Sequence, residues 1–289
     1  MKIVLSIAVF TFAALLVLNP ALAAPNENAS DKGKQSAQFS IPKHAVEISK
    51  GVFSLGQAVD VNGKPVQGLM IIDYDEKHKK PAGTPGNGKP DKNGNGDGET
   101  TCYAYIAKGA KWNSPESYLL DPSNGDGLDE DYIISKVAQS MDSWEVESGN
   151  NIFAGITNGV IDGADTTSTD GKNEIYFGGI AEPGVLAVTI VWYERGGPPS
   201  QRDIVEYDMI FDDQHKWENV GPNSETELVD TEAYDFWAVA AHELGHAAGM
   251  DHPDNSCTEE TMYAFANTGE TKQRTLHDGD KAGILNLFS

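Results

Sequence analysis

Three histidines and one glutamate near the C-terminus have the spacing of a metal site. His242 and His246 are four residues apart, so both imidazoles can lie on one face of a helix and bind the same ion. Glu243 lies beside that face, where it can act as a general base without binding the metal. Gly249 can end the helix in a sharp turn, and His252 can then return as a third ligand. Three neutral imidazoles leave one coordination position open, which is typical of a catalytic zinc site.

The chemistry that this arrangement predicts is hydrolysis by an activated water molecule. Zinc lowers the pKa of a bound water to about 7 and polarises a carbonyl group. Glu243 would take a proton from the water and later deliver it to the leaving amine. A core-facing helix that carries these residues by chance is the alternative, but the pattern His-Glu-x-x-His-x-x-Gly-x-x-His is far more specific than its first five residues.

The same segment resembles the metzincin clan of zinc proteases and, within it, the matrixin family, over about residues 100–289. Met262 resembles the methionine that lies beneath the zinc in this clan. The resemblance implies that Tyr263 forms a wall of the specificity pocket and that the family's edge strand, which pairs with bound substrate, includes Gly184, Val185, Leu186 and Ala187. It also implies an α/β fold with a twisted, mostly parallel sheet, one antiparallel edge strand, a backing helix and an active-site helix.

The sequence departs from the matrixin pattern in two places. Val188 and Ile210 stand where two histidines of the family's second, structural zinc would be, so we expect one catalytic zinc and no structural one. The cysteine that keeps many matrixins latent has no counterpart before Cys102, which lies where the mature domain should begin. The sequence therefore argues against a cysteine switch.

The chain has only two cysteines, Cys102 and Cys257. An even number of cysteines in an exported protein suggests a disulfide, and two free thiols are the alternative. Export is indicated by Lys2, by the apolar run over residues 3–18, and by Ala21-Leu22-Ala23. These features predict a cleavable signal peptide over residues 1–23 and a secreted protein, with a membrane anchor as the alternative.

The composition narrows the range of partners. The chain has 289 residues, with 21 basic and 44 acidic side chains and a formal net charge of −23. So acidic a surface repels nucleic acid and anionic membranes. We expect a monomer that acts on a protein or peptide substrate and does not bind a membrane after signal cleavage.

The order of patterns along the chain divides it into segments. Residues 24–76 are predicted to be a leader or pro-region with a small β unit, which has a hairpin turn at Asn62-Gly63. Residues 77–100 are rich in Gly, Pro, Asn and Lys and are predicted to be a linker. Residues 101–289 are predicted to be the catalytic domain. Within that domain, we expect helices over 128–147, 235–248 and 278–288, and strands over 102–107, 174–177, 185–193 and 204–211.

Acidic loops suggest calcium as a second ion, because Ca²⁺ prefers hard oxygen ligands. One cluster comprises Asp162, Asp165, Asp170 and Glu174, and another comprises Asp121, Asp126, Asp129 and Asp131. Asp212 matches a calcium-binding position of matrixins, although His215 replaces its usual acidic companion. Solvated turn carboxylates are the alternative for each cluster.

These observations favour a secreted zinc-dependent metalloendopeptidase. The alternative is a non-catalytic secreted zinc-binding protein that uses a protease fold for adhesion or scaffolding. A zinc hydrolase that acts on non-peptide bonds is less favoured, because an edge strand suits the binding of an extended peptide.

Overall fold

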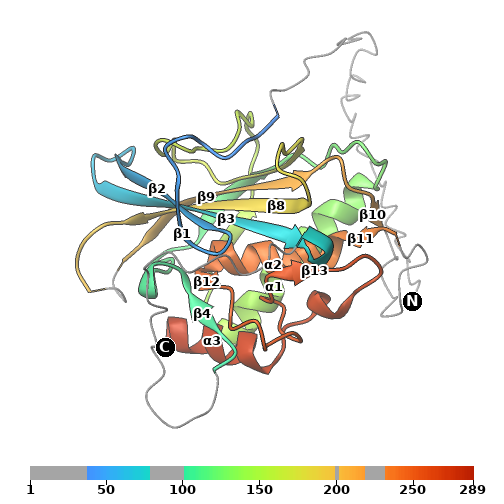
Figure 1. Ribbon diagram of the computed structural model, residues 1–289. Coiled ribbons are helices and arrows are strands. Elements are labelled where there is room, and N and C mark those ends of the chain that lie inside the picture. Colours follow the sequence, from blue (N-terminus) through green and yellow to red (C-terminus); the bar gives the residue numbers. More distant parts are fainter. Residues whose placement is uncertain (1–37, 79–100, 199–201, 219–231) are drawn as a thin grey trace, which may run out of the picture. The chain divides into compact units, whose positions relative to one another are not determined.

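The computed structural model describes residues 38–78, 101–198, 202–218 and 232–289, which belong to one compact unit. The predicted signal peptide and residues 79–100 of the predicted linker lie outside the described residues. A mixed sheet of nine strands forms the frame of this unit (Figure 1). Its path is β1-β2-β3-β8-β9-β7-β5-β6, with β13 also paired to β3. The strands are β1 (Val46–Ser49), β2 (Val52–Val59), β3 (Pro65–Asp75), β5 (Glu116–Leu120), β6 (Phe153–Ile156), β7 (Glu174–Gly178), β8 (Val185–Glu194), β9 (Ile204–Asp212) and β13 (Phe265–Ala266).

The part of the sheet that follows residue 101 has the predicted arrangement. Strands β9, β7, β5 and β6 are parallel, and β8 is antiparallel to β9. The resemblance implied that β8 is an edge strand, and in the structure it is not. Strand β3 pairs with it antiparallel along its length, and β2 and β1 continue the sheet beyond β3. The predicted small β unit therefore forms, with Asn62 and Gly63 in the β2–β3 turn, and it extends the main sheet.

Three helices lie below the sheet in the view of Figure 1: α1 (Glu130–Ser148), α2 (Phe236–Ala248) and α3 (Asp278–Phe288). All three were expected. Asp129 is the N-cap of helix α1, and its side chain accepts a hydrogen bond from Tyr132 N at 2.8 Å. Strands β5 and β6 have no counterpart among the predicted elements. Shorter pairs link β10 (Trp217–Glu218) to β11 (Tyr234–Asp235) and β12 (Met250–Asp251) to β4 (Ala104–Tyr105).

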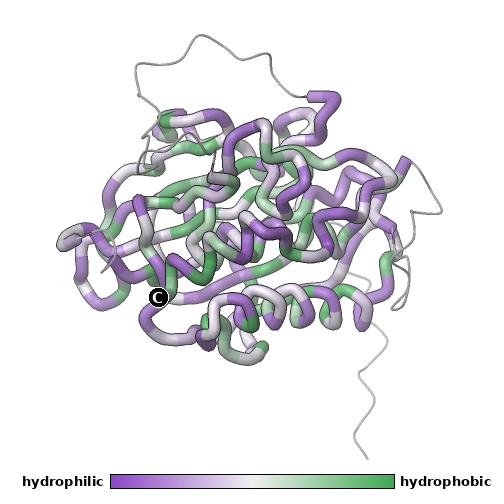
Figure 2. Tube along the Cα trace, turned by 90° about the horizontal axis from the view of Figure 1, so that it is seen from below, coloured by the Kyte–Doolittle hydropathy of each residue, from purple (hydrophilic) through white to green (hydrophobic). Residues whose placement is uncertain are grey.

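Apolar side chains fill both faces of the sheet. The larger cluster lies between the sheet and the helices and includes Trp144, Phe211 and Phe236. A second cluster on the other face includes Met70 and Trp192. Hydrophobic stretches interleaved with hydrophilic residues run through the strands and helices in Figure 2. No helix among the described residues is long and apolar enough to span a membrane.

Candidate zinc site

Helix α2, which carries two of the predicted ligands, is buried along its whole length. The Asp235 side chain caps its start by accepting a hydrogen bond from Ala238 N at 2.7 Å, and Arg274 donates to the same carboxylate at 2.9 Å. Two indole N–H groups, of Trp144 and Trp112, donate at 2.8 Å to carbonyls of the helix. These contacts hold the helix in the core, so its side chains have little freedom to move.

The turn after α2 requires glycine. Gly249 has φ +111°, and a Cβ there would lie 2.6 Å from the carbonyl oxygen of Ala110. Both the left-handed conformation and the close backbone approach exclude a side chain. The chain then forms the short strand β12, which brings His252 next to His242 and His246. The sequence pattern predicted this turn.

The three histidines converge on one point. Their Nε2 atoms are 3.1 Å apart for His242 and His246, 3.2 Å for His242 and His252, and 3.1 Å for His246 and His252. The Nδ1 atoms of His242 and His246 lie 2.6 and 3.0 Å from the carbonyl oxygens of Thr261 and Met250. Because a carbonyl only accepts, each Nδ1 carries the proton and each Nε2 presents a lone pair to the common centre.

This donor set fits zinc. Lone pairs that face one another repel, and a cation between them removes the repulsion. Tetrahedral ligands at the usual Zn–N distance of about 2.0–2.1 Å lie about 3.3 Å apart, close to the observed separations. Imidazole is a ligand that zinc prefers. The structure thus brings together the three residues that the spacing predicted as zinc ligands.

Met262 lies beneath the site. It is fully buried, and a Cβ on Gly245 of α2 would lie 2.2 Å from its sulfur, so only glycine fits there. Asp280 of α3 holds this turn from behind, because its carboxylate accepts hydrogen bonds from the amides of Thr261 at 2.7 Å and Met262 at 3.1 Å. Since the carbonyl of Thr261 contacts His242, the turn also orients that ligand.

Glu243 lies in the interior next to the histidines. Its Oε2 accepts a hydrogen bond from the hydroxyl of Thr189 on β8 at 2.5 Å, and its Oε1 has no hydrogen-bond partner among the described residues. Burial raises the pKa of Glu243 well above its ordinary value, and the charge of Asp73 raises it further. The carboxylate therefore has one oxygen fixed and one free. Thr189 was not predicted, and no sequence pattern marks it.

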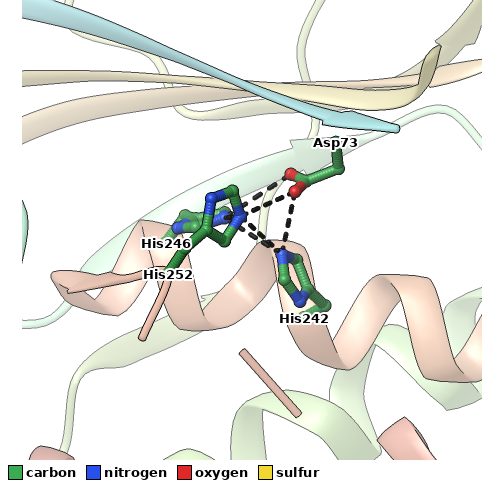
Figure 3. A group of neighbouring side chains, drawn as sticks. All are labelled: Asp73, His242, His246 and His252. Carbon is green, nitrogen blue, oxygen red and sulfur yellow. Dashed lines mark hydrogen bonds and ion pairs between the residues drawn. The ribbon is translucent and has the colours of Figure 1, made fainter. Parts of the chain in front are cut away.

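Asp73, at the end of β3, is a second residue of the site that the sequence did not reveal (Figure 3). Its Oδ1 lies 2.7 Å from Nε2 of His252 and 3.1 Å from Nε2 of His242, and its Oδ2 lies 3.5 Å from Nε2 of His246. Burial by itself would raise the pKa of Asp73, but the charges of His242 and His252 hold it well below its ordinary value. Asp73 and the three histidines form one group of candidate ligand atoms.

The predicted substrate-binding residues lie along β3. Val185 pairs with Tyr74 and Ala187 with Asp73, and the carbonyl of Gly184 accepts a hydrogen bond from Asp75 N at 2.8 Å. A small pocket next to His242 is lined by residues that include Tyr74, Leu186 and Tyr263. The strand that was expected to receive a substrate thus contacts a segment of the same chain.

The remaining predicted positions are accounted for individually. Cys102 and Cys257 form a disulfide. Val188 and Ile210 pair with each other across β8 and β9, and both are buried in the second apolar cluster.

Some of the acidic residues predicted as calcium ligands lie close enough together to bind one ion. Lys172 lies within the group formed by Asp162, Asp170 and Glu174, and its ammonium is 2.6 Å from Asp162. A second group contains Asp165, Asp170 and Glu206, a residue that the sequence analysis did not include. The Oε2 of Glu206 accepts hydrogen bonds from two loop amides, whereas its buried Oε1 has no partner among the described residues.

Most of the other predicted acidic residues accept hydrogen bonds from backbone amides. Asp121 accepts a hydrogen bond from Ser123 N, Asp126 accepts one from Trp217 N, and Asp129 caps α1. Asp131 lies in the first turn of that helix. Asp212 accepts a hydrogen bond from Ile180 N at 3.1 Å and lies 3.6 Å from the ring of His215. Within the described part of the chain, these residues do not form a further group of ligand atoms.

Comparisons with known proteins point to the same region. A family model for matrixin matches residues 198–289. Stromelysin-1 from Equus caballus is 37% identical to this chain over 83 residues, a stretch that covers 28% of this chain and 15% of the stromelysin. The family match contains all three histidines, Glu243 and Met262. The C-terminal part of this chain is therefore a matrixin-like domain.

Proposed function

We propose that this chain is a secreted zinc-dependent metalloendopeptidase, with His242, His246 and His252 as the zinc ligands. The observation that carries the proposal is the convergence of three Nε2 atoms beside a buried glutamate that has one free oxygen. The match to matrixins supports it. Secretion is supported by the apolar N-terminal run and by the disulfide, which is typical of exported proteins.

The residues around the centre have separate roles in this proposal. Zinc, when bound, would activate a water molecule and polarise the scissile carbonyl. Glu243 takes a proton from that water at Oε1, its free oxygen, and delivers it to the nitrogen of the leaving amine. Thr189 keeps Oε2 occupied and so holds the carboxylate in one orientation. The peptide-binding residues would be Gly184, Val185, Leu186 and Ala187, which can pair with an extended backbone, and Tyr263 in the pocket wall.

A closed, non-catalytic zinc site is the second candidate function, and Asp73 is the observation that favours it. Structural zinc sites have four protein ligands, and Asp73 provides a fourth donor here. Such a site would not need a glutamate with a free oxygen next to the metal. A buried carboxylate oxygen without a donor costs free energy, and such a cost is expected at a catalytic site, so we favour the catalytic role.

We further propose a calcium ion at Asp165, Asp170 and Glu206. Carboxylates are the ligands that Ca²⁺ prefers. The free, buried Oε1 of Glu206 supports this site in particular, because a buried carboxylate oxygen without a donor is costly. The neighbouring group at Asp162 is less suited, because the ammonium of Lys172 makes close contacts with two of its carboxylates, Asp162 and Asp170, and of these only Asp170 belongs to the proposed site.

The decisive experiment maps the cleavage sites in a peptide library after incubation with the zinc-loaded chain. The chain should be assayed both intact and after it has been cut between residues 78 and 101, because β3 precedes the cut, pairs with β8 and carries Asp73, which contacts all three ligands. We expect cleavage that a zinc chelator abolishes and that Glu243→Gln lacks, and metal analysis should find one zinc per chain. The absence of chelator-sensitive cleavage in both forms would favour the non-catalytic alternative.

A further inference from the structure

Strand β3 occupies the side of β8 that an extended substrate would need. It pairs with β8 antiparallel, from Val66 opposite Glu194 to Tyr74 opposite Val185. Its other side pairs with β13, where Tyr74 lies opposite Phe265. A peptide that binds by strand addition requires a free sheet edge. Both edges of β8 are taken, by β9 and by β3, so a substrate cannot pair there while β3 remains.

The end of β3 also covers the metal centre. The Asp73 carboxylate oxygens lie 2.7–3.5 Å from the three Nε2 atoms. These distances are similar to the 3.1–3.2 Å that separate the nitrogens from one another. The Asp73 carboxylate therefore lies where a fourth ligand would be, with Oδ1 near His242 and His252 and Oδ2 near His246, and a carboxylate oxygen is an ordinary zinc ligand. Its Oδ2 is buried and has no hydrogen-bond partner among the described residues. A cation at the centre would give this oxygen the partner that the described residues do not supply.

From these two features we infer that the chain is a latent precursor, in which Asp73 supplies the fourth zinc ligand and β3 occupies the place of the substrate. The inference rests on the proposed function. A bound Asp73 excludes both water and a substrate carbonyl from the metal, so Glu243 has no water molecule to deprotonate. Latency would thus come from an aspartate on a paired strand, and no cysteine is involved. Removing β3 would open the metal and the edge of β8 together.

Asp73 is not the only residue that holds the end of β3 against the rest of the chain. Asp75 accepts hydrogen bonds from Tyr234 Oη at 3.0 Å and from His78 N at 2.7 Å, and Glu76 accepts one from Asn267 at 2.6 Å. The backbone pairs with β8 and β13 are independent of the Asp73 side chain. Loss of the Asp73 carboxylate should therefore open the metal to a small ligand while the strand still excludes an extended peptide.

The test uses the full chain with Co²⁺ in place of zinc and azide as the probe. The visible absorption of Co²⁺ responds to the number and type of its ligands. We expect the spectrum of the unaltered chain to be insensitive to azide. Asp73→Ala should have a different spectrum and should bind azide saturably, at least about tenfold more tightly. Asp75→Asn is the matched control, because this buried carboxylate on the same strand contacts His78 and Tyr234 and none of the three ligand histidines, and it should behave as the unaltered chain.

Asp73→Asn serves as a second variant of almost unchanged size, so the result does not depend on Asp73→Ala folding. Thermal unfolding and circular dichroism establish that each variant is folded. Identical spectra and identical azide binding in the unaltered chain and in either folded Asp73 variant would overturn the assignment of Asp73 as a ligand.

Peptide hydrolysis separates this inference from the proposed function. A cleavage site for a specific protease is inserted between residues 78 and 101, and the chain is assayed before and after cutting and dilution. We expect little hydrolysis before cutting and a rise of at least about tenfold after it, because the freed segment dissociates on dilution. Full hydrolysis by the uncut, unaltered chain would overturn latency. An azide response to Asp73→Ala without hydrolysis in any form would retain Asp73 as a ligand and refute the peptidase.

Discussion

The hydroxyl of Thr189 and the carboxylate of Glu243 are joined by a buried hydrogen bond of 2.5 Å between β8 and α2. This bond leaves only one oxygen of the proposed general base available for a proton. It also links the base to the strand on which a substrate is proposed to pair. Thr189 is therefore expected to position Glu243 without touching the substrate.

Replacement of Thr189 by Val should reduce kcat and leave KM and zinc content nearly unchanged. Hydrogen bonds to charged groups contribute about 1.5–3 kcal/mol, so we expect a fall of roughly 10–100-fold. Thr189→Ser keeps the hydroxyl and should retain most of the activity. Steady-state kinetics on the activated chain would measure this, and an equal loss in the Ser and Val variants would contradict the role given to the hydroxyl.

Glu243→Gln and His246→Ala should differ in their effects. The first substitution keeps the size of the side chain but removes its basic oxygen, so zinc should remain bound and the rate should fall by about 10²–10⁴-fold or more. The second removes one of three histidine ligands, so zinc should be lost or greatly weakened. Metal analysis and peptide hydrolysis on the same samples distinguish the two. Equal zinc loss in both variants would mean that Glu243 supports the metal.

The stability of the chain should depend on pH and calcium through Glu206. Burial and the charge of Asp208 raise the pKa of Glu206 to about 9. Since an unfolded Glu has a pKa of about 4.3, the stability gained from protonation is complete below that value and is lost as the pH rises through about 9. We therefore expect the melting temperature in a chelator to fall between about pH 5 and 9, and Ca²⁺ to reverse the fall.

Two variants control this calcium experiment. Glu206→Gln removes the charge at the proposed site and should reduce both the pH dependence and the effect of Ca²⁺. Asp131→Asn alters an exposed carboxylate in the first turn of α1, outside this group of ligand atoms, and should leave both unchanged. If Ca²⁺ fails to raise the melting temperature of the unaltered chain at alkaline pH, the proposed calcium site is wrong.

The disulfide between Cys102 and Cys257 spans 155 residues. Closing a loop of that length stabilises a protein by about 5 kcal/mol in the chain-entropy model. We expect no alkylation of the native, oxidised chain, and a Cys102→Ser/Cys257→Ser variant should unfold at lower denaturant concentration. Free reaction of both thiols in the native protein would show that the bond does not form in solution.

The convergence of the three histidines could be predicted from the sequence because their arrangement is local. His242 and His246 depend only on helical periodicity, and His252 depends on a turn that Gly249 marks. The three helices and strands β7, β8 and β9 followed from apolar periodicity in the same way, whereas the strand expected over 102–107 is only the two-residue β4. The short strands β5 and β6 were missed because a run of four or five residues carries little periodic signal.

Asp73 was missed because its role depends on strand pairing over a long sequence separation. It lies 169 residues from His242, and no spacing rule connects a strand to a partner so distant. One signal was present, since Asp73 follows the apolar run of residues 69–72 and is itself buried. A carboxylate inside a buried strand requires a partner, which indicates a site without identifying it.

Both cysteines of the chain lie outside residues 38–78. A cut between residues 78 and 101 would therefore leave the segment that carries Asp73 attached only by noncovalent contacts. Its binding would change from an intramolecular equilibrium, governed by a high effective concentration, to a bimolecular one. The liberated segment would then act as a competitive inhibitor in trans, so that the activity of a freshly processed sample would depend on its dilution. The new N-terminus near Cys102 would meanwhile stay tethered to the loop that precedes Met262.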